Sequence, residues 1–115
     1  MHWQKITGLM LLGLGLAAPA VAAERAALAD AAERRDKAAV RSLLQAGNDV
    51  NAAQVDGTTA LHWAAYNDDA ETVALLLRAK ANVNAVNRYG VPPIAQACTN
   101  GSAAIVKQLL DAGAD

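Results

Sequence analysis

An internal repeat constrains the fold of this chain more than any other feature. When the sequence is shifted against itself by 33 residues, 12 of the 33 positions in 24–56 match those of 57–89. The same shift matches 9 of the 26 positions of 57–82 to residues 90–115. Most of the matching positions are apolar. A period of this length indicates a solenoid, in which each repeat becomes stable only by stacking on its neighbours.

Each period is predicted to contain two short helices and an extended connector. Residues 60–66 are rich in alanine, and Thr59 before them is a favourable N-cap. A turn at 67–69 leads into a second helix over 70–79, whose apolar residues recur at i, i+3 and i+4. These residues are Val73, Leu76 and Leu77. The stretch 80–90 contains turn residues and is the expected connector to the next unit.

The second period resembles the ankyrin repeat. Its start, DGTTALHWAA (56–65), and its continuation, ETVALLLRAKANVNA (71–85), resemble the family's Thr-Pro-Leu-His turn, leucine-rich helix and Gly-Ala-Asp-Val-Asn exit. The resemblance covers 24–115. It implies an all-α solenoid of about three stacked helix–turn–helix units, with β-hairpin or extended fingers projecting at roughly right angles. It also implies a protein-binding module that is not an enzyme and needs no cofactor or metal.

The period divides the chain into four segments. Residues 1–23 are set apart as a signal peptide, and 24–56 form a highly charged first repeat that resembles an N-terminal cap. The second repeat spans 57–89. The third spans 90–115 and is truncated inside the repeat pattern, so we expect a fragment of a longer array or a shortened gene product. Its outer apolar residues are then expected to be uncovered: Val106, Leu109 and Leu110.

The first 23 residues have the features of an export signal. An uncharged, mostly apolar run at 6–18 is broken by Pro19, and small residues follow at 20–23. We predict cleavage after Ala22 or Ala23 and a bacterial protein that is periplasmic or secreted. The alternative is an uncleaved membrane anchor, because the uncharged run reaches 18 residues when extended to Ala23, a marginal length for a bilayer of about 30 Å.

Composition argues against several classes of protein. The formal net charge of −1 becomes −2 once Lys5 leaves with the signal peptide, so strong attraction to nucleic acid is not expected. Cys98 is the only cysteine, which excludes an intramolecular disulfide. It aligns with Ala65, and we predict that it is a small buried core residue. The chain has no phenylalanine, which favours close-packed alanine and leucine helices.

Lys80 and His62 are two residues of the second repeat for which the sequence predicts a structural role. Lys80 stands where the first and third repeats have Gly47 and Gly113. This position follows a helix and is expected to be left-handed, so replacement of Lys80 by glycine should stabilise the domain. His62 lies beside a tryptophan, a pairing that on its own suggests an active site. No second histidine remains after cleavage, and no catalytic motif is present, so the ankyrin resemblance implies that His62 bonds Thr59 and nearby backbone.

The predicted binding surface consists of the variable positions of the repeats. In the resembling fold, Trp63 lies on the concave side of the first helix, and Tyr66 follows one turn later. Large aromatic side chains are favoured binding anchors. The alternative is that both residues cover the core or a neighbouring repeat. The candidate protein-binding residues are Trp63, Tyr66, Asn67, Arg88, Tyr89, Gln96 and Thr99.

Two functions stay open from the sequence. The first is an exported scaffold or adaptor that binds a protein partner through its fingertips and the concave surface of its first helices. The second is the N-terminal targeting or accessory part of a longer enzyme, whose catalytic domain lies beyond residue 115. Neither function involves nucleic acid or a small-molecule substrate at 24–115, and membrane contact is expected only through the signal peptide.

Overall fold

A computed structural model describes residues 26–115, so the predicted signal peptide lies outside the described residues. Within 26–115 the chain forms six α-helices and no extended strand; an isolated antiparallel bridge joins Ala53 to Thr59. The helices are α2 (Ala27–Glu33), α3 (Lys37–Gln45), α4 (Ala60–Tyr66), α5 (Ala70–Arg78), α6 (Pro93–Thr99) and α7 (Ala103–Asp111). Each predicted repeat contains one helix pair. The predicted all-α solenoid of three helix–turn–helix units is therefore confirmed.

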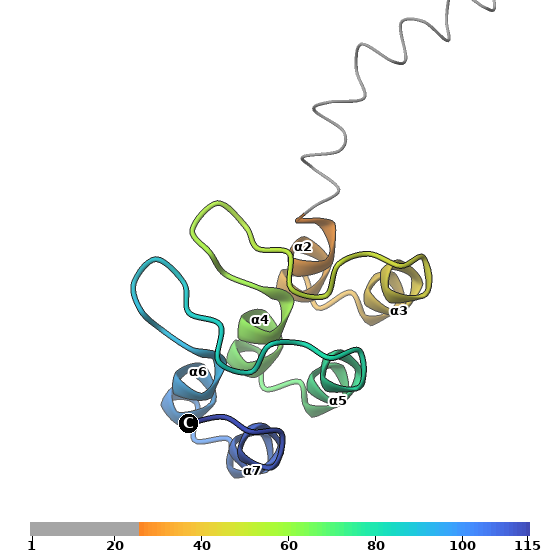
Figure 1. The fold of residues 1–115 in the computed structure, drawn as a ribbon. Helices are drawn as coiled ribbons and strands as arrows, with labels where there is room; N and C mark the ends of the chain where they lie inside the picture. Colours follow the sequence, from red (N-terminus) through yellow and green to blue (C-terminus); the bar gives the residue numbers. More distant parts are fainter. Residues whose placement is uncertain (1–25) are drawn as a thin grey trace, which may run out of the picture.

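The helices form two layers (Figure 1). The first helices of the repeats, α2, α4 and α6, contact one another in sequence, and α3, α5 and α7 form the second layer. The connectors α3–α4 and α5–α6 loop out beside the first layer as two neighbouring fingers (Figure 1). Each first helix thus lies at the base of a finger.

Side-chain caps fix where the helices begin. The hydroxyl of Thr59 accepts from the backbone N–H of His62 at the start of α4, as the sequence predicted. At the start of α5, a carboxylate oxygen of Asp69 accepts from the N–H of Thr72 at 3.1 Å. Asp36 does the same for α3. Asp36 and Asp69 are 33 residues apart, so the second helix begins at the same position in two successive repeats.

The core is built from alanine and large aliphatic residues. Ala31, Ala64 and Ala97 occupy the same place in the three repeats and are fully buried, which lets the first helices approach closely. The largest fully buried apolar side chains include Leu28, Leu61, Leu76, Ile105 and Leu109. Burial of one such side chain contributes about 1.5–3 kcal/mol. The predicted close packing of alanine and leucine helices is confirmed.

Two predictions for the third repeat are wrong. Leu109 is fully buried, because it occupies the inward position that Leu76 holds in the second repeat. Cys98 is exposed, although Ala65 at the equivalent position is buried. The difference arises because α6 covers Ala65, whereas no described residue covers α6 on its other side. Val106 is half-buried and Leu110 is 51% exposed, in keeping with the expected uncovered face.

Three positions of the repeat adopt left-handed backbone, one of them held by Gly57 and Gly90 with φ of 85° and 76°. Lys80 has φ of 72°, beside 86° and 103° for its equivalents Gly47 and Gly113. The predicted left-handed conformation at Lys80 is confirmed. The turn between the paired helices provides the second set of residues: Arg35, Asp68 and Gly101, with φ of 62°, 58° and 69°.

Candidate functional site

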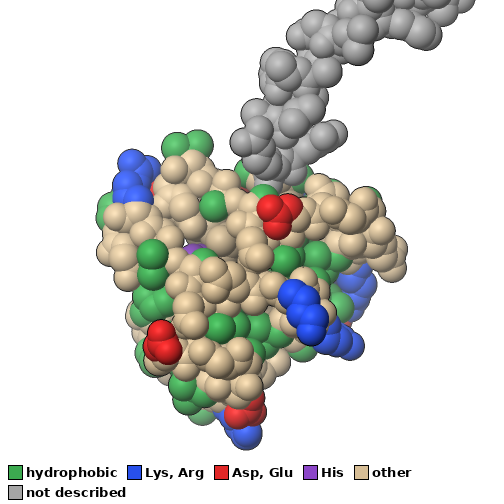
Figure 2. All heavy atoms as spheres, in the orientation of Figure 1, with side chains coloured by type: hydrophobic (Ala, Val, Ile, Leu, Met, Phe, Trp, Pro, Cys, Tyr) green, Lys and Arg blue, Asp and Glu red, His purple; other side chains and the backbone are tan. Residues whose placement is uncertain are grey.

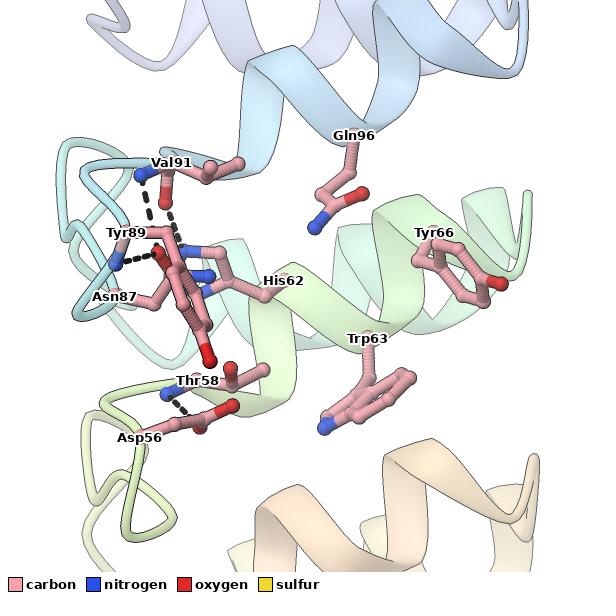
Figure 3. A pocket seen from close by; sticks show the side chains of 9 residues that line it. All are labelled: Asp56, Thr58, His62, Trp63, Tyr66, Asn87, Tyr89, Val91 and Gln96. Atoms are coloured by element: carbon pink, nitrogen blue, oxygen red, sulfur yellow. Dashed lines mark hydrogen bonds between the residues drawn. The ribbon is translucent and has the colours of Figure 1, made fainter.

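A groove of about 410 Å³ lies between the first-helix layer and the two fingers (Figure 3). Its base comes from α4 and α6, and its sides come from the finger before each of these helices. The lining residues are Asp56, Thr58, His62, Trp63, Tyr66, Asn87, Tyr89, Val91 and Gln96.

His62 uses both ring nitrogens to hold the scaffold together. Its Nδ1 accepts from the backbone N–H of Thr59 at 3.1 Å and lies 2.9 Å from the Thr59 hydroxyl. Its Nε2 donates to the carbonyl of Val91 at 2.7 Å, which ties α4 to the second finger. The predicted bonds to Thr59 and nearby backbone are confirmed, and the bond to Val91 extends this role to the next repeat.

The environment of His62 favours the neutral imidazole. Its side chain is fully buried, and burial lowers its pKa; the bond to the Val91 carbonyl and the charge of Asp56 oppose this shift. With Nδ1 accepting and Nε2 donating, the ring has the single proton that this bonding pattern needs. His62 is therefore a positioning residue of the scaffold.

Trp63 is half-buried at the side of the groove and packs partly against the core. Its indole N–H donates to the side-chain oxygen of Gln54 at 2.9 Å. Its ring meets that of Tyr66 edge-on, with centroids 5.6 Å apart and planes at 87°. Trp63 is interpreted from the sequence either as a binding anchor or as a cover for the core. Its surroundings are compatible with both, since the same side chain packs against the core and lines the groove.

The fingertips are joined by backbone contacts. The N–H of Arg88 in the second finger donates to the carbonyl of Asp56 in the first at 2.7 Å. Gly57 has φ of 85°, and a Cβ there would lie 3.1 Å from the Cα of Asn87. A glycine is therefore required where the two fingers touch.

Side-chain oxygens shape each fingertip. The Asp56 carboxylate accepts from the N–H of Thr58 at 3.0 Å, and the Asn87 amide oxygen accepts from the N–H groups of Tyr89 and Val91 (Figure 3). Hydrogen bonds from Thr58 chiefly, with a smaller effect of the Arg88 charge, hold the pKa of Asp56 below its usual value. Asp56 is therefore ionised at neutral pH.

Four of the seven candidate binding residues meet in the groove: Trp63, Tyr66, Tyr89 and Gln96. Arg88 lies beside it, with its guanidinium carbon 5.6 Å from the centroid of the Tyr89 ring. Two residues lie elsewhere. The Asn67 amide donates to the carbonyl of Ala32 at 3.0 Å, and the Thr99 hydroxyl donates to the carbonyl of Ala95 at 2.9 Å.

Several lining residues were not among the candidates from the sequence: Asp56, Thr58, His62, Asn87 and Val91. Asp56 and Asn87 carry a usable signal, because Asp56 directly precedes Gly57 and Asn87 lies three residues before Gly90, spacings that are typical of tight turns. Asp56 and Asn87 come close to each other only because the two fingers pair. This pairing brings together residues that are about one repeat apart in the sequence, and the pattern within a single repeat does not predict such contacts.

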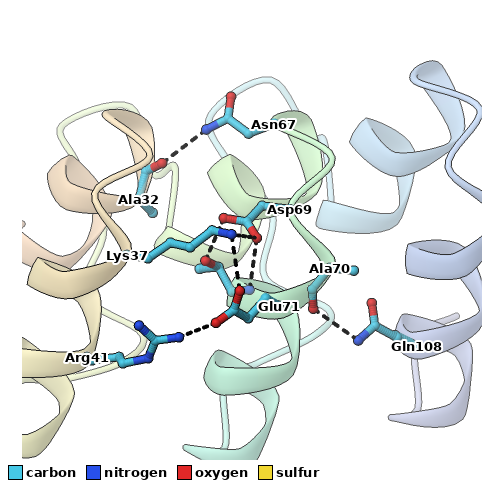
Figure 4. A network of polar contacts seen from close by, with 9 residues as sticks. Ala32, Lys37, Arg41, Asn67, Asp69, Ala70, Glu71 and Gln108 are labelled. Atoms are coloured by element: carbon cyan, nitrogen blue, oxygen red, sulfur yellow. Dashed lines mark hydrogen bonds and ion pairs between the residues drawn. The ribbon is translucent and has the colours of Figure 1, made fainter.

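A second polar cluster lies on the other helix layer (Figure 4). Lys37 bonds Glu71 at 3.1 Å and lies 3.6 Å from Asp69, while Arg41 pairs with Glu71. These residues join α3 to α5. Figure 2 shows acidic and basic side chains dispersed over the visible face, which favours a solvated surface.

The described residues offer few features of other site classes. Among residues 26–115, no group of three His, Cys, Asp or Glu side chains is placed to hold a metal ion. None of the described helices combines the length and apolarity needed to cross a membrane. The groove is thus the main concave feature to which the predicted binding residues contribute.

Comparisons with known proteins agree with this architecture. Residues 28–115 match the family described as ankyrin repeats (3 copies). Among solved structures, the ankyrin-repeat domain of human ASB11 matches with a TM-score of 0.72 and 34% identity over 76% of this chain. The match covers 40% of that chain, so this protein spans less than half of its length. No curated protein matches the sequence. The chain belongs to the ankyrin-repeat family, whose repeats generally mediate protein–protein interactions.

Proposed function

We propose that this protein is a scaffold or adaptor that binds a protein partner outside the cytoplasm through its groove and fingertips. The observation that carries the proposal is the set of aromatic side chains around the groove. Tyr66 is 51% exposed and Tyr89 is 72% exposed, with Trp63 beside them. Aromatic residues are enriched among those that dominate binding energy at protein interfaces.

The scaffold around these side chains supports a binding role. His62 joins α4 to the second finger, and the Arg88 N–H joins the two fingertips. A surface held by such contacts loses little conformational freedom when a partner binds, and this reduces the entropic cost of association.

Photo-crosslinking tests where the partner binds. A photoreactive residue placed at Tyr89 should crosslink to the partner, and the crosslink should weaken when Trp63 is replaced by alanine. The control is the same residue at Arg78, an exposed position at the end of α5. Crosslinking from Arg78 with none from Tyr89 would place the interface elsewhere and contradict the proposal.

Location outside the cytoplasm rests on the sequence of residues 1–23. The uncharged run, Pro19 and the small residues before the first repeat support export. A fusion of this segment to a phosphatase that is active only after export should be active, and the mature chain should begin at Ala23 or Glu24. An intact N-terminus in the membrane fraction would favour the anchor instead.

A further inference from the structure

The groove contains one ionised side chain. Asp56 is the only Asp, Glu, Lys or Arg among the lining residues, and the neighbouring His62 is buried with both nitrogens bonded. Thr58 holds the carboxylate of Asp56 in place through its N–H. In the described part of the chain, no lysine or arginine lies within ion-pair distance of Asp56. The carboxylate is therefore held in one orientation and makes no salt bridge; the positive charge of Arg88 acts on it only from beyond ion-pair distance.

Aromatic rings flank the space that this carboxylate borders. Tyr89 extends from the second finger near Asp56, and Trp63 lies across the groove from it (Figure 3). Tyr66 adds a third ring beside Trp63. The faces of such rings carry a negative electrostatic potential and attract cations.

The chain already provides an example of this attraction. The guanidinium carbon of Arg88 lies 5.6 Å from the centroid of the Tyr89 ring, within the usual range of a cation–π contact. Arg88 itself does not line the groove. The ring of Tyr89 is thus compatible with a guanidinium as a neighbour, and the groove provides a second place for one.

Two further carboxylates lie close to Trp63. The side-chain nitrogen of Gln54 donates to Asp30 at 2.7 Å and to Glu33 at 3.0 Å, while its oxygen accepts from the Trp63 indole. One glutamine therefore connects the groove to an acidic pair on α2. This charge distribution attracts a basic partner and repels an acidic one.

We propose that the groove binds its protein partner through a basic side chain, with arginine preferred over lysine, which inserts between Tyr89 and Trp63 and faces Asp56. This inference rests on the proposed function and specifies the chemistry of the partner. Arginine is preferred because a planar guanidinium can stack on an aromatic ring and also donate two hydrogen bonds to one carboxylate.

Selection from a library of random dodecapeptides tests the proposal on the full chain. Peptides that bind the unchanged protein and not the Trp63→Ala variant are retained. We expect an arginine or lysine at one shared position in these peptides. Replacing that arginine by citrulline, which has nearly the same shape without the charge, should weaken binding on the order of tenfold.

Matched variants separate the charge of Asp56 from its structural role. Asp56→Asn keeps an oxygen for the Thr58 N–H and should remove most of the preference for arginine over citrulline. Asp49→Asn is the control, because Asp49 accepts from the N–H of Asn51 at 2.9 Å in a similar turn outside the groove. It should leave the preference unchanged. Tyr89→Ala, at an exposed fingertip, should weaken binding of the arginine peptide without unfolding the chain.

The outcomes distinguish this inference from the proposed function. Peptides that depend on Trp63 but share no basic residue, or an arginine preference that persists in Asp56→Asn, would overturn the inference and leave the groove a binding site. If no selected peptide depends on Trp63, both the inference and the groove as the binding surface are overturned.

Discussion

At the residue scale, His62 shows how a side chain that suggests catalysis can serve the fold instead. One ring nitrogen accepts from Thr59 and the other donates to Val91, so neither is free to accept a proton from a substrate. Complete burial also disfavours the charged form. The resemblance to the ankyrin repeat implied this role, but the bond to Val91 depends on the next repeat and was not foreseen.

The lowered pKa of His62 predicts that the free energy of unfolding decreases as the pH falls below about 6.5. In that range the unfolded histidine takes up a proton more readily than the folded one, which favours unfolding. Above a pH of about 6.5, neutral His62 makes its full contribution to the free energy of unfolding. Denaturant unfolding at about pH 7.5 and about pH 5.5 measures the difference, since most carboxylates remain ionised between these values. His62→Gln should reduce the difference relative to the unchanged chain. Equal pH dependence in the unchanged chain and in His62→Gln would contradict the prediction.

The left-handed backbone at Lys80 predicts a stabilising substitution. A side chain with a Cβ costs about 1–2 kcal/mol in this conformation, and glycine returns about 0.4–1 kcal/mol of that through the greater freedom of the unfolded chain. Lys80→Gly should therefore raise the free energy of unfolding by about 0.5–1 kcal/mol. Gly47→Ala, where the new Cβ meets no neighbouring atom, should lower it through backbone strain alone. A less stable Lys80→Gly variant would mean that the lysine side chain contributes more than its strain costs.

Cys98 shows that alignment of the repeats does not by itself predict whether a residue is buried. Its equivalence with Ala65 predicted burial, but burial depends on what lies on the next helix. An exposed thiol should react with a maleimide in the native chain at about the rate it shows after denaturation. A reaction that requires denaturant would restore the original prediction.

At the element scale, the repeats are joined by a recurring asparagine contact. Asn67 donates to the carbonyl of Ala32, and Asn100 donates to the carbonyl of Ala65 one repeat later. Asparagine therefore occurs at the same position of the second and third repeats because it makes the same contact with the repeat before it. Asn67 is also a predicted binding residue, and within the fold its amide donates to the preceding repeat.

The contacts between neighbouring elements should differ in strength. Asn67→Ala should lower the free energy of unfolding by about 0.5–1.5 kcal/mol, because it removes a partly buried hydrogen bond to the Ala32 carbonyl, which still accepts from the N–H of Arg35. Glu71→Gln removes ion pairs that are half-exposed and should cost less than about 1 kcal/mol. Denaturant unfolding in low and high salt measures both, and only the Glu71 variant should respond to salt. A salt-dependent loss for Asn67→Ala would contradict this assignment.

The helices themselves were well predicted, because their causes are local. The expected helix at 60–66 agrees with α4, and the expected helix at 70–79 extends one residue beyond α5, where Ala79 is the C-cap. Thr59 and the spacing of apolar residues determine these bounds. The fingertip contacts were not predicted, because the bond between Arg88 and Asp56 joins two fingers whose pairing has no local signature.

At the scale of the whole molecule, stability should vary along the stack. The central helix α4 packs against both α2 and α6, whereas α2 and α6 each contact one first helix within the described residues. In a linear array, the energy of a repeat includes the interfaces with its neighbours. Native-state hydrogen exchange should therefore be slowest for amides of α4 and faster for those of α2 and α7. Uniform exchange across the three repeats would indicate a single cooperative unit.

The groove has a consequence for how such a chain can diversify. Its lining comes from the last residue of the first repeat, both ends of the second repeat and the start of the third. A gene duplication would copy one repeat, but the binding groove is formed by parts of three repeats. The duplicated segment and the binding surface therefore have different boundaries. Exchange of a single repeat therefore alters the binding surface on both of its sides. Related arrays can acquire new specificities by recombination alone, before any point mutation within a groove.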